Sequence, residues 1–263
     1  MSFIINPYVY AAPVDPDCAA FLTATGITNP TISGAVCTLV TSLKSANLWA
    51  KFDAIYPMVG GTATTHMYNL RNPVNTNAAF RLSFIGGWTH SANGAQPNGS
   101  NGYADTFYNP NNSAQLNNHH LSYYSRTQSN GTEVEFGNFT GVNSSLIEIR
   151  TNSISYFRVN NGLGTINFTD TDSMAFYLAN RTASNLINAW RNSSKLAQST
   201  TLISTSRGNL NYYLAAINNN NVPQFYTTKQ CAWASIGQGF SDSEASTLYS
   251  IIQTFQTTLG RQV

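Results

Sequence analysis

The stretch that decides the fold is FYLANRTASNLINAWRNSSKLAQST, residues 176–200. Short apolar runs stand between polar ones in it, and the polar residues are almost all Asn, Ser, Thr or Gln. Short apolar runs bounded by turn residues are typical of β-strands, and Asn and Ser favour the turns between strands. We therefore predict two short strands around a tight turn, forming an outer pair in a β-sandwich whose solubility does not depend on charge.

The same pattern extends over residues 57–240. Short runs rich in Val, Ile, Phe, Tyr and Thr alternate there with turn signals, as in AAFRLSFIG, HLSYYSRT, SLIEIRT, SISYFRV and CAWASIG. Asn-Gly pairs, which are strong turn signals, occur at 93–94, 98–99, 101–102, 130–131 and 161–162. Many short strands without helices between them predict an antiparallel β-sandwich or barrel.

Helical patterns precede this region, between residues 15 and 56. Asp15 and Pro16 predict the start of a helix that Gly26 ends, and Asn29 and Pro30 predict the start of a second helix. A further short helix is predicted from the apolar spacing of Leu48, Trp49, Phe52 and Ile55.

A last helix is predicted over residues 241–258. Ser241 and Glu244 have the S-x-x-E spacing of a capping box, in which each side chain satisfies a backbone N–H of the first turn. The apolar residues that follow form one stripe. The predicted organisation is an extended arm at 1–14, a helical segment at 15–56, a sandwich at 57–240 and a C-terminal helix at 241–263, packed on the sandwich or on the helical segment.

The composition narrows the range of functions. Of 263 residues, 42% are hydrophobic and only 9% are charged, whereas soluble domains carry about 25% charged residues. The net charge is +2 and the chain contains no basic run, which argues against nucleic acid as a partner. No run of 18 apolar residues is present, so no membrane insertion is expected, and the N-terminus lacks the basic start of a signal peptide.

Three cysteines are present, at positions 18, 37 and 231. The odd count and the lack of a C-x-x-C motif lead us to expect no disulfide framework. Cys18 and Cys37 fall on apolar positions of the predicted helices, so we expect them to act as small buried hydrophobic side chains.

The motifs NRTASN and AWRNSSKLA resemble the strand and hairpin of the laminin-G-like, concanavalin A-like lectin and glucanase sandwich. Asn192 stands where the hairpin turn begins, with Ser193 in place of the usual Gly. The segments INPYVYAA, GITNPTISGAV, HLSYYSRT and TLYSIIQTFQTTLGRQV, with others between them, resemble a module of uncharacterised bacteriophage virion and tail-associated proteins. The resemblance covers nearly the whole chain. It implies a mainly β, jelly-roll sandwich on a virus particle.

The resemblance also implies a metal. Laminin-G-like sandwiches often bind Ca²⁺ at their rim through Asp side chains and backbone carbonyls, and Ca²⁺ prefers six to eight oxygen ligands. The candidate Ca²⁺ ligands are Asp105, Asp170 and Asp172. The alternative is that these residues are ordinary carboxylates of turns.

Two carboxylates are the candidates for catalysis. Concanavalin A-like glucanases carry E-x-D-x-x-E on one strand, and Glu133 and Glu135 match its first spacing, but no third carboxylate follows. We expect this pair to lie on a solvated strand face. The four histidines, at 66, 90, 119 and 120, are scattered and do not form a metal-binding motif. The sequence therefore leads us to expect a protein that is not an enzyme.

Carbohydrate binding fits the composition, because sugars are neutral and suit aromatic and amide side chains. The stretch GGWTHSANGAQPNGSNGYADT, residues 86–106, is predicted to be a long surface loop. The candidate sugar-binding residues are Trp88, His90, Asn93, Tyr103 and Asp105 in this loop, and Arg126, which would add a platform together with Tyr123, Tyr124, Tyr212 and Tyr213. In the adjacent pairs Tyr123-Tyr124 and Tyr212-Tyr213, one ring of each should face the core. The alternative is a polar loop that covers a sandwich edge.

Together these features favour a non-enzymatic bacteriophage structural protein, a capsid decoration, fibre or tail component with a lectin-like sandwich. Its expected partners are other virion proteins, copies of itself and host-surface polysaccharide. Tyr8 and Tyr10 in the apolar arm would anchor it, after synthesis in the host cytoplasm. The alternatives are a carbohydrate-binding adhesin and a β-glucanase that uses Glu133 and Glu135.

Overall fold

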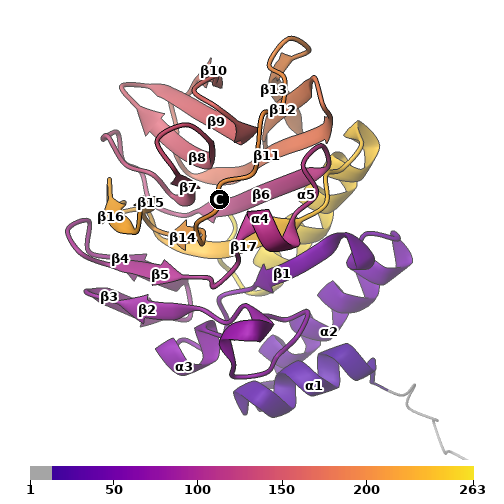
Figure 1. Ribbon diagram of the computed structural model, residues 1–263. Coiled ribbons are helices and arrows are strands. Elements are labelled where there is room, and N and C mark those ends of the chain that lie inside the picture. The colour runs from indigo at the N-terminus through magenta and orange to yellow at the C-terminus, as the bar shows by residue number, and fades with distance from the viewer. Residues whose placement is uncertain (1–13) are drawn as a thin grey trace, which may run out of the picture.

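The structure is a computed structural model that describes residues 14–263. Two packed sheets form a β-sandwich, with helices at both ends of the chain (Figure 1). Neighbouring strands run antiparallel, except for one short parallel contact. The predicted fold class, an antiparallel β-sandwich with N-terminal helices and a C-terminal helix, is confirmed.

The first sheet, sheet I, contains the opening stretch. Its strands follow the order β13 (Ser194–Ser199), β12 (Leu186–Arg191), β11 (Ala175–Ala183), β6 (His119–Ser125), β17 (Cys231–Gly237), β4 (Gly94–Pro97) and β3 (Trp88–Ser91). A further strand, β1 (Phe52–Tyr56), also pairs with β17. The hairpin β12–β13 forms the edge, as predicted for an outer pair, and Asn192 adopts the positive φ of 54° at its turn.

The second sheet, sheet II, packs face to face against sheet I. Its strands follow the order β10 (Ile166–Thr169), β9 (Ile154–Asn161), β8 (Ser144–Thr151), β7 (Phe136–Phe139), β14 (Tyr213–Leu214), β5 (Tyr103–Asp105) and β2 (Ser83–Ile85). A hairpin of β15 (Ile217–Asn219) and β16 (Val222–Gln224) joins this sheet at β7.

Alternation along the strands divides the apolar side chains between two cores. On β6, Tyr123 lies between the sheets, whereas Tyr124 lies on the opposite face of sheet I under the helices. Tyr212 is likewise in the core between the sheets and Tyr213 is not. Sheet I therefore contributes apolar side chains to a core on each of its faces, whereas sheet II contributes mainly to the core between the sheets.

The long helices near the two ends of the chain, residues 16–45 and 242–258, cover the outer face of sheet I (Figure 1). Asp15 caps α1 (Pro16–Thr25) and Gly26 ends it, while Asn29 caps α2 (Pro30–Ser45), as predicted. The predicted capping box of Ser241 and Glu244 begins α5 (Asp242–Thr258), which packs on α2 and on sheet I. Among residues 14–263, no helix has both the length and the hydrophobicity needed to cross a bilayer.

The helix predicted through residues 48–55 is wrong. The chain forms one 3₁₀ turn, η1 (Trp49–Lys51), and then strand β1. Phe52 and Ile55 lie under the helices, while Ala54 and Tyr56 face the core between the sheets, so a strand buries both sides of this segment. The spacing of apolar residues within this segment could not reveal that it pairs with β17, which lies far away in the sequence. Three short helical turns also interrupt the β region: α3 (Ala63–His66), η2 (Asn77–Ala79) and α4 (Pro110–Ser113).

The expectation that Cys18 and Cys37 are unpaired is also wrong. The two residues form a disulfide that joins α1 to α2, with their Cα atoms 5.1 Å apart, and Cys231 is a buried free thiol. The helices pack against each other, which brings the two apolar positions together. The bond joins residues 19 positions apart in the sequence. It should stabilise the fold by about 3 kcal/mol, because it lowers the conformational entropy of the unfolded chain.

Candidate functional site

The stretch 86–106 is not the long surface loop that the sequence predicted. It forms β3, β4 and β5, with Trp88 opposite Pro97 and with β5 between β14 and β2. Its Asn-Gly pair at 93–94 makes the β3–β4 turn, where Asn93 is exposed. Strand pairing places the candidate residues of this stretch in different surroundings.

Trp88 and His90 lie at the corner where β2 of sheet II passes into β3 of sheet I. The indole N–H of Trp88 donates to the carbonyls of Ile85 and Tyr103, at 3.1 and 3.2 Å. Nδ1 of His90 lies 2.9 Å from Nδ1 of His66, and burial lowers the pKa of His66 to about 3. These side chains therefore brace the corner, and Trp88 holds the backbone of Tyr103.

Three tyrosines form a platform on the outer face of sheet II. We call Tyr103, Tyr213 and Tyr226 the tyrosine platform; the ring centre of Tyr103 lies 4.7 Å from that of Tyr213 and 6.5 Å from that of Tyr226. Ala104 and Leu214 face the core, so the neighbouring Tyr103 and Tyr213 point outward. Within residues 14–263, none of the three hydroxyls has a hydrogen-bond partner. Burial raises the pKa of Tyr213 to about 12, so this hydroxyl keeps its proton at neutral pH.

Asp105 lies at the edge of the platform, opposite Tyr213 in the sheet. Its carboxylate accepts the N–H of Phe107 at 2.8 Å and the amide of Asn211 at 3.1 and 3.2 Å. Burial raises the pKa of this carboxyl, although both hydrogen bonds oppose the rise. The platform thus combines three aromatic rings with a fixed carboxylate–amide pair.

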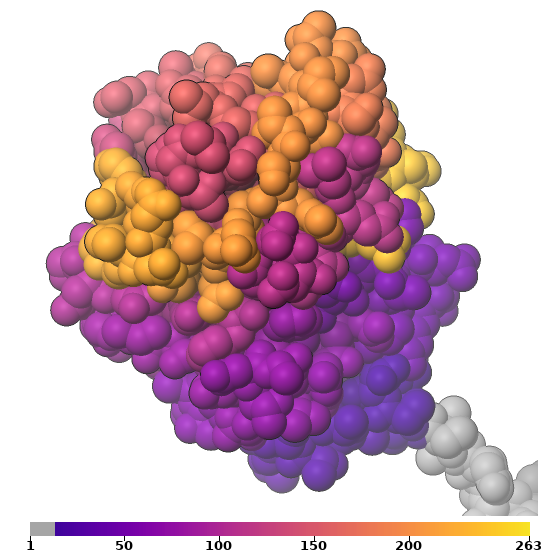
Figure 2. All heavy atoms as spheres, in the orientation of Figure 1, coloured from indigo at the N-terminus to yellow at the C-terminus, as the bar shows by residue number. Residues whose placement is uncertain are grey.

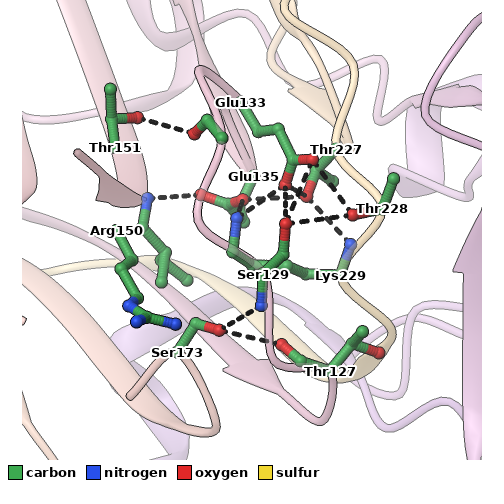
Figure 3. A network of polar contacts seen from close by, with 12 residues as sticks. Thr127, Ser129, Glu133, Glu135, Arg150, Thr151, Ser173, Thr227, Thr228 and Lys229 are labelled. Atoms are coloured by element: carbon green, nitrogen blue, oxygen red, sulfur yellow. Dashed lines mark hydrogen bonds and ion pairs between the residues drawn. The ribbon is translucent and has the colours of Figure 1, made fainter. Parts of the chain in front are cut away.

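A buried network of charged and hydroxyl side chains includes Thr227, the residue after Tyr226, and is shown in Figure 3. Nζ of Lys229 lies 2.7 Å from Oε2 of Glu133 and 3.0 Å from Oε1 of Glu135. The side chains of Lys229 and Glu135 are both 0% exposed, and Glu135 also accepts the N–H of Ile149 at 2.6 Å. The expectation that Glu133 and Glu135 lie on a solvated strand face is therefore wrong. They precede β7 and lie beneath the segment that leads into β17.

The two carboxylates compete for one lysine. Burial raises the pKa of Glu135 to about 7 despite the attraction of Lys229. The pKa of Glu133 is lowered, because its hydrogen bond and charge contact with Lys229 outweigh its partial burial. Because Glu135 is enclosed, a substrate cannot reach both carboxylates, so the geometry does not favour the β-glucanase alternative.

The network fixes the segment that carries Tyr226. The hydroxyl of Thr227 lies 2.9 Å from Glu135 and 3.1 Å from Glu133, and that of Thr228 donates to Glu133 at 3.0 Å. These side chains point toward one another in Figure 3. Tyr226 immediately precedes Thr227. The network therefore fixes the backbone that carries the Tyr226 ring of the platform.

A pocket lies on the other side of this segment, on the same outer face. It encloses about 280 Å³ between Phe225, which is 50% exposed, and the outer side chains of β8 and β9, Leu146, Glu148 and Arg158. Burial raises the pKa of Glu148 and lowers that of Arg158. In Figure 2 the orange-gold segment after β14 forms part of the surface beside the strands of sheet II.

Sequence reasoning missed Tyr226 and Phe225 as site residues. They lie more than a hundred residues from Tyr103, and only the sheet brings them together. The available signal was the Phe-Tyr pair itself, which stands in the otherwise polar stretch NNNNVPQFYTTKQ.

Arg126 is not joined to the platform by any contact that the structure describes within residues 14–263. Its guanidinium donates to the carbonyl of Arg261 at 2.6 Å and to the side chain of Gln230 at 2.9 Å. It therefore links the end of β6 to the C-terminal residues. Tyr8 and Tyr10 lie outside the described residues, so their anchoring role stays a prediction.

The three candidate metal ligands lie in two places. Asp105 is at the platform, whereas Asp170 accepts the hydroxyls of Ser155 and Tyr177 at 2.6 and 2.7 Å and lies 3.4 Å from Nε of Arg191. Asp172 accepts the amide of Gln128 at 2.8 Å. Residues 14–263 hold no group of three or more His, Cys, Asp or Glu side chains that could bind a metal. Calcium binding stays a prediction.

Comparison with known proteins supports the fold. The sequence matches no protein-family profile and no curated protein. A sialidase from Trypanosoma rangeli has a TM-score of 0.52 at 10% identity, over 82% of this chain and 39% of its own. The NanB sialidase from Streptococcus pneumoniae has a TM-score of 0.42 at 12% identity, over 51% of this chain and 24% of its own. The CBM40 domain of the Ruminococcus gnavus IT-sialidase has a TM-score of 0.39 at 15% identity, over 51% of this chain and 83% of its own.

The similarity to the Trypanosoma rangeli sialidase concerns the fold alone, which is a β-sandwich. This chain spans less than half the length of either sialidase. The expectation that the protein is not an enzyme is corrected, because the Trypanosoma rangeli protein that shares this architecture is a sialidase and therefore an enzyme.

Proposed function

We propose that the chain binds carbohydrate through the tyrosine platform on the outer face of sheet II. The observation that carries the proposal is the set of three adjacent tyrosine rings whose hydroxyls have no partner within residues 14–263. Asp105 and Asn211 add polar groups in fixed positions at the edge.

The chemistry of this surface suits a sugar. A pyranose ring has apolar C–H faces that pack on aromatic rings, and its hydroxyls both donate and accept hydrogen bonds, as tyrosine hydroxyls do. Binding sites of this kind combine aromatic side chains with a few fixed polar groups. The sialidase that shares the fold acts on a carbohydrate, which agrees with this class of ligand.

The proposal predicts a large loss of binding when the central ring is removed. Tyr103→Ala should weaken binding to the best ligand on a glycan array at least about tenfold, which corresponds to about 1.4 kcal/mol. Tyr103→Phe, which keeps the ring, should weaken binding about two- to tenfold through the lost hydroxyl.

The matched control is Tyr156→Ala, which removes a half-buried tyrosine on β9 of the same sheet. It should leave glycan binding unchanged in surface plasmon resonance with the same ligand. Equal losses in the Tyr103 and Tyr156 variants, or unchanged binding in Tyr103→Ala, would refute the platform as the binding site.

We also propose that the protein is displayed on a bacteriophage particle, as its sequence resemblance implies. Mass spectrometry of gradient-purified particles from the native source should then detect it at a fixed copy number. Many copies would identify a capsid decoration protein, and a few copies would identify a fibre or tail component. If the protein were absent from purified particles, the proposal that it is displayed on a bacteriophage particle would be refuted.

A further inference from the structure

A second groove lies on the opposite side of the sandwich from the tyrosine platform. It encloses about 660 Å³ on the outer face of sheet I, between the edge hairpin β12–β13 and the start of α5. Thr182, Asn188 and Gln198 line it from the sheet. Phe240 and Asp242 line it from the chain that enters the helix. This volume lies within the range of small-molecule sites.

Side-chain amides from neighbouring strands lie at the base of this groove. Asn188 and Gln198 line it. Asn180, which is 0% exposed, lies beneath them, and the three residues are in register across β11, β12 and β13. Oδ1 of Asn188 accepts the amide of Asn180 at 2.9 Å and the indole N–H of Trp190 at 3.2 Å. The side chain of Asn188 is only 2% exposed, and its Nδ2 has no hydrogen-bond partner within residues 14–263. A buried amide fixed by two hydrogen bonds thus presents a free donor to the groove.

The charged groups around the groove are already paired. Lys51 lies 2.6 Å from Glu244, and Lys195 lies 2.7 Å from Asp242. The N-terminus of α5 is closed by the capping box of Ser241 and Glu244. A charged ligand would have to compete with these pairs, whereas a neutral ligand leaves them intact.

The remaining lining groups are neutral. The hydroxyl of Thr182 has no hydrogen-bond partner within the described part of the chain, and the half-buried Leu186 adds apolar surface. This groove therefore offers an amide donor, a free hydroxyl and an apolar side chain, which are complementary to a ligand with many hydroxyls and C–H faces.

We propose that this groove is a second binding site, specific for a neutral saccharide unit, in which Asn188 Nδ2 and the Thr182 hydroxyl contact the sugar. The site is separate from the tyrosine platform and does not depend on it. It also assigns a role to the stretch 176–200, whose polar and uncharged residues form the floor and one wall.

The chain contains an independent reporter for each site. The indole N–H of Trp190 is bonded to Asn188, and that of Trp88 is bonded to the backbone of Tyr103. In two-dimensional ¹H–¹⁵N spectra of the full chain, glucose, galactose and N-acetylglucosamine are titrated separately at millimolar concentrations. At least one sugar should shift the Trp190 indole and Asn188 amide signals to saturation. The absence of any such shift with all three sugars would overturn the proposal.

Two variants test the contacts. Thr182→Val removes the hydroxyl at constant shape and should weaken the affinity read at Trp190 about three- to tenfold. Asn188→Asp keeps the acceptor for Asn180 and Trp190 but removes the donor, and should weaken the affinity at least as much. Unchanged affinity in both variants would overturn the proposal.

The controls separate this site from the platform. Thr169→Val, on the exposed edge strand β10, should leave the Trp190 titration unchanged. Tyr103→Ala should also leave it unchanged, even where it abolishes the response at Trp88. Loss of the Trp190 response in Tyr103→Ala would refute the independence of the two sites.

Discussion

An Arg261→Met variant is expected to lose on the order of 5 kcal/mol of its free energy of unfolding. Arg261 is 0% exposed, and no carboxylate among residues 14–263 forms an ion pair with it. Its guanidinium donates instead to the side-chain oxygen of Gln256 at 2.6 Å. It also donates, at 2.6–3.3 Å, to four backbone carbonyls, those of Pro57, Met58, Ala92 and Ala232. Methionine would fill most of the space. The carbonyl of Ala232 would keep the amide of Gln256 as a donor, but the other buried acceptors would lose the donor that Arg261 provides, each at a cost of about 1–3 kcal/mol.

Chemical denaturation followed by tryptophan fluorescence measures this loss. The matched control is Arg126→Met, because Arg126 is only partly buried and makes two side-chain hydrogen bonds. The control should cost about 1–2 kcal/mol. If Arg261→Met were no more destabilising than Arg126→Met, the buried guanidinium would not anchor the end of the chain.

A Lys229→Met variant is expected to lose about 3–5 kcal/mol at pH 8, the usual effect of leaving a buried charge without its partner. The melting temperature should fall by about 10–15 °C for a chain of this size. The loss should be smaller at pH 5, because the pKa of Glu135 is about 7 and its protonated form needs no counter-ion. The double variant Lys229→Met/Glu135→Gln should recover much of the stability, since it buries no unpaired charge.

Glu135→Gln is the single variant that matches Lys229→Met. Its effect is measured in the pH dependence of the free energy of unfolding. Folding raises the pKa of Glu135 from 4.5 to about 7, so the folded chain keeps this proton after the unfolded chain has lost it. The contribution of Glu135 therefore stabilises the fold below pH 4.5 and falls by up to about 3 kcal/mol as the pH rises toward 7. Glu135→Gln should remove this part of the pH profile. An identical profile in the variant would contradict the raised pKa.

The fold could be predicted from the sequence because its signals are local. Short apolar runs between turn residues in the stretch 176–200 predicted strands at the edge of a sandwich, and Asn192 lies at the predicted turn. The caps at Asp15 and Ser241 predicted helix starts correctly, since a cap acts within one turn of its own helix.

The site could be predicted only in part, because its contacts join distant segments. Tyr103 and Asp105 were selected from composition, but Tyr226 reaches them only through the pairing of β5 with β14. Glu135 was expected in solvent because its counter-ion, Lys229, lies 94 residues away. The pairing of β1 with β17 and the disulfide were missed for the same reason.

Sheet I cannot be completed until residues 231–237 have been synthesised, because β17 pairs with β1, β4 and β6. At about 5–20 residues per second, roughly 10–35 s separate the synthesis of β1 from that of β17. During this time β1 lacks its partner strand, while the helices α1 and α2, which contact each other locally, can already form. Pairing across so long a separation folds slowly. Closure of the sandwich is therefore a late step, and the chain carries unpaired strand edges through most of its synthesis.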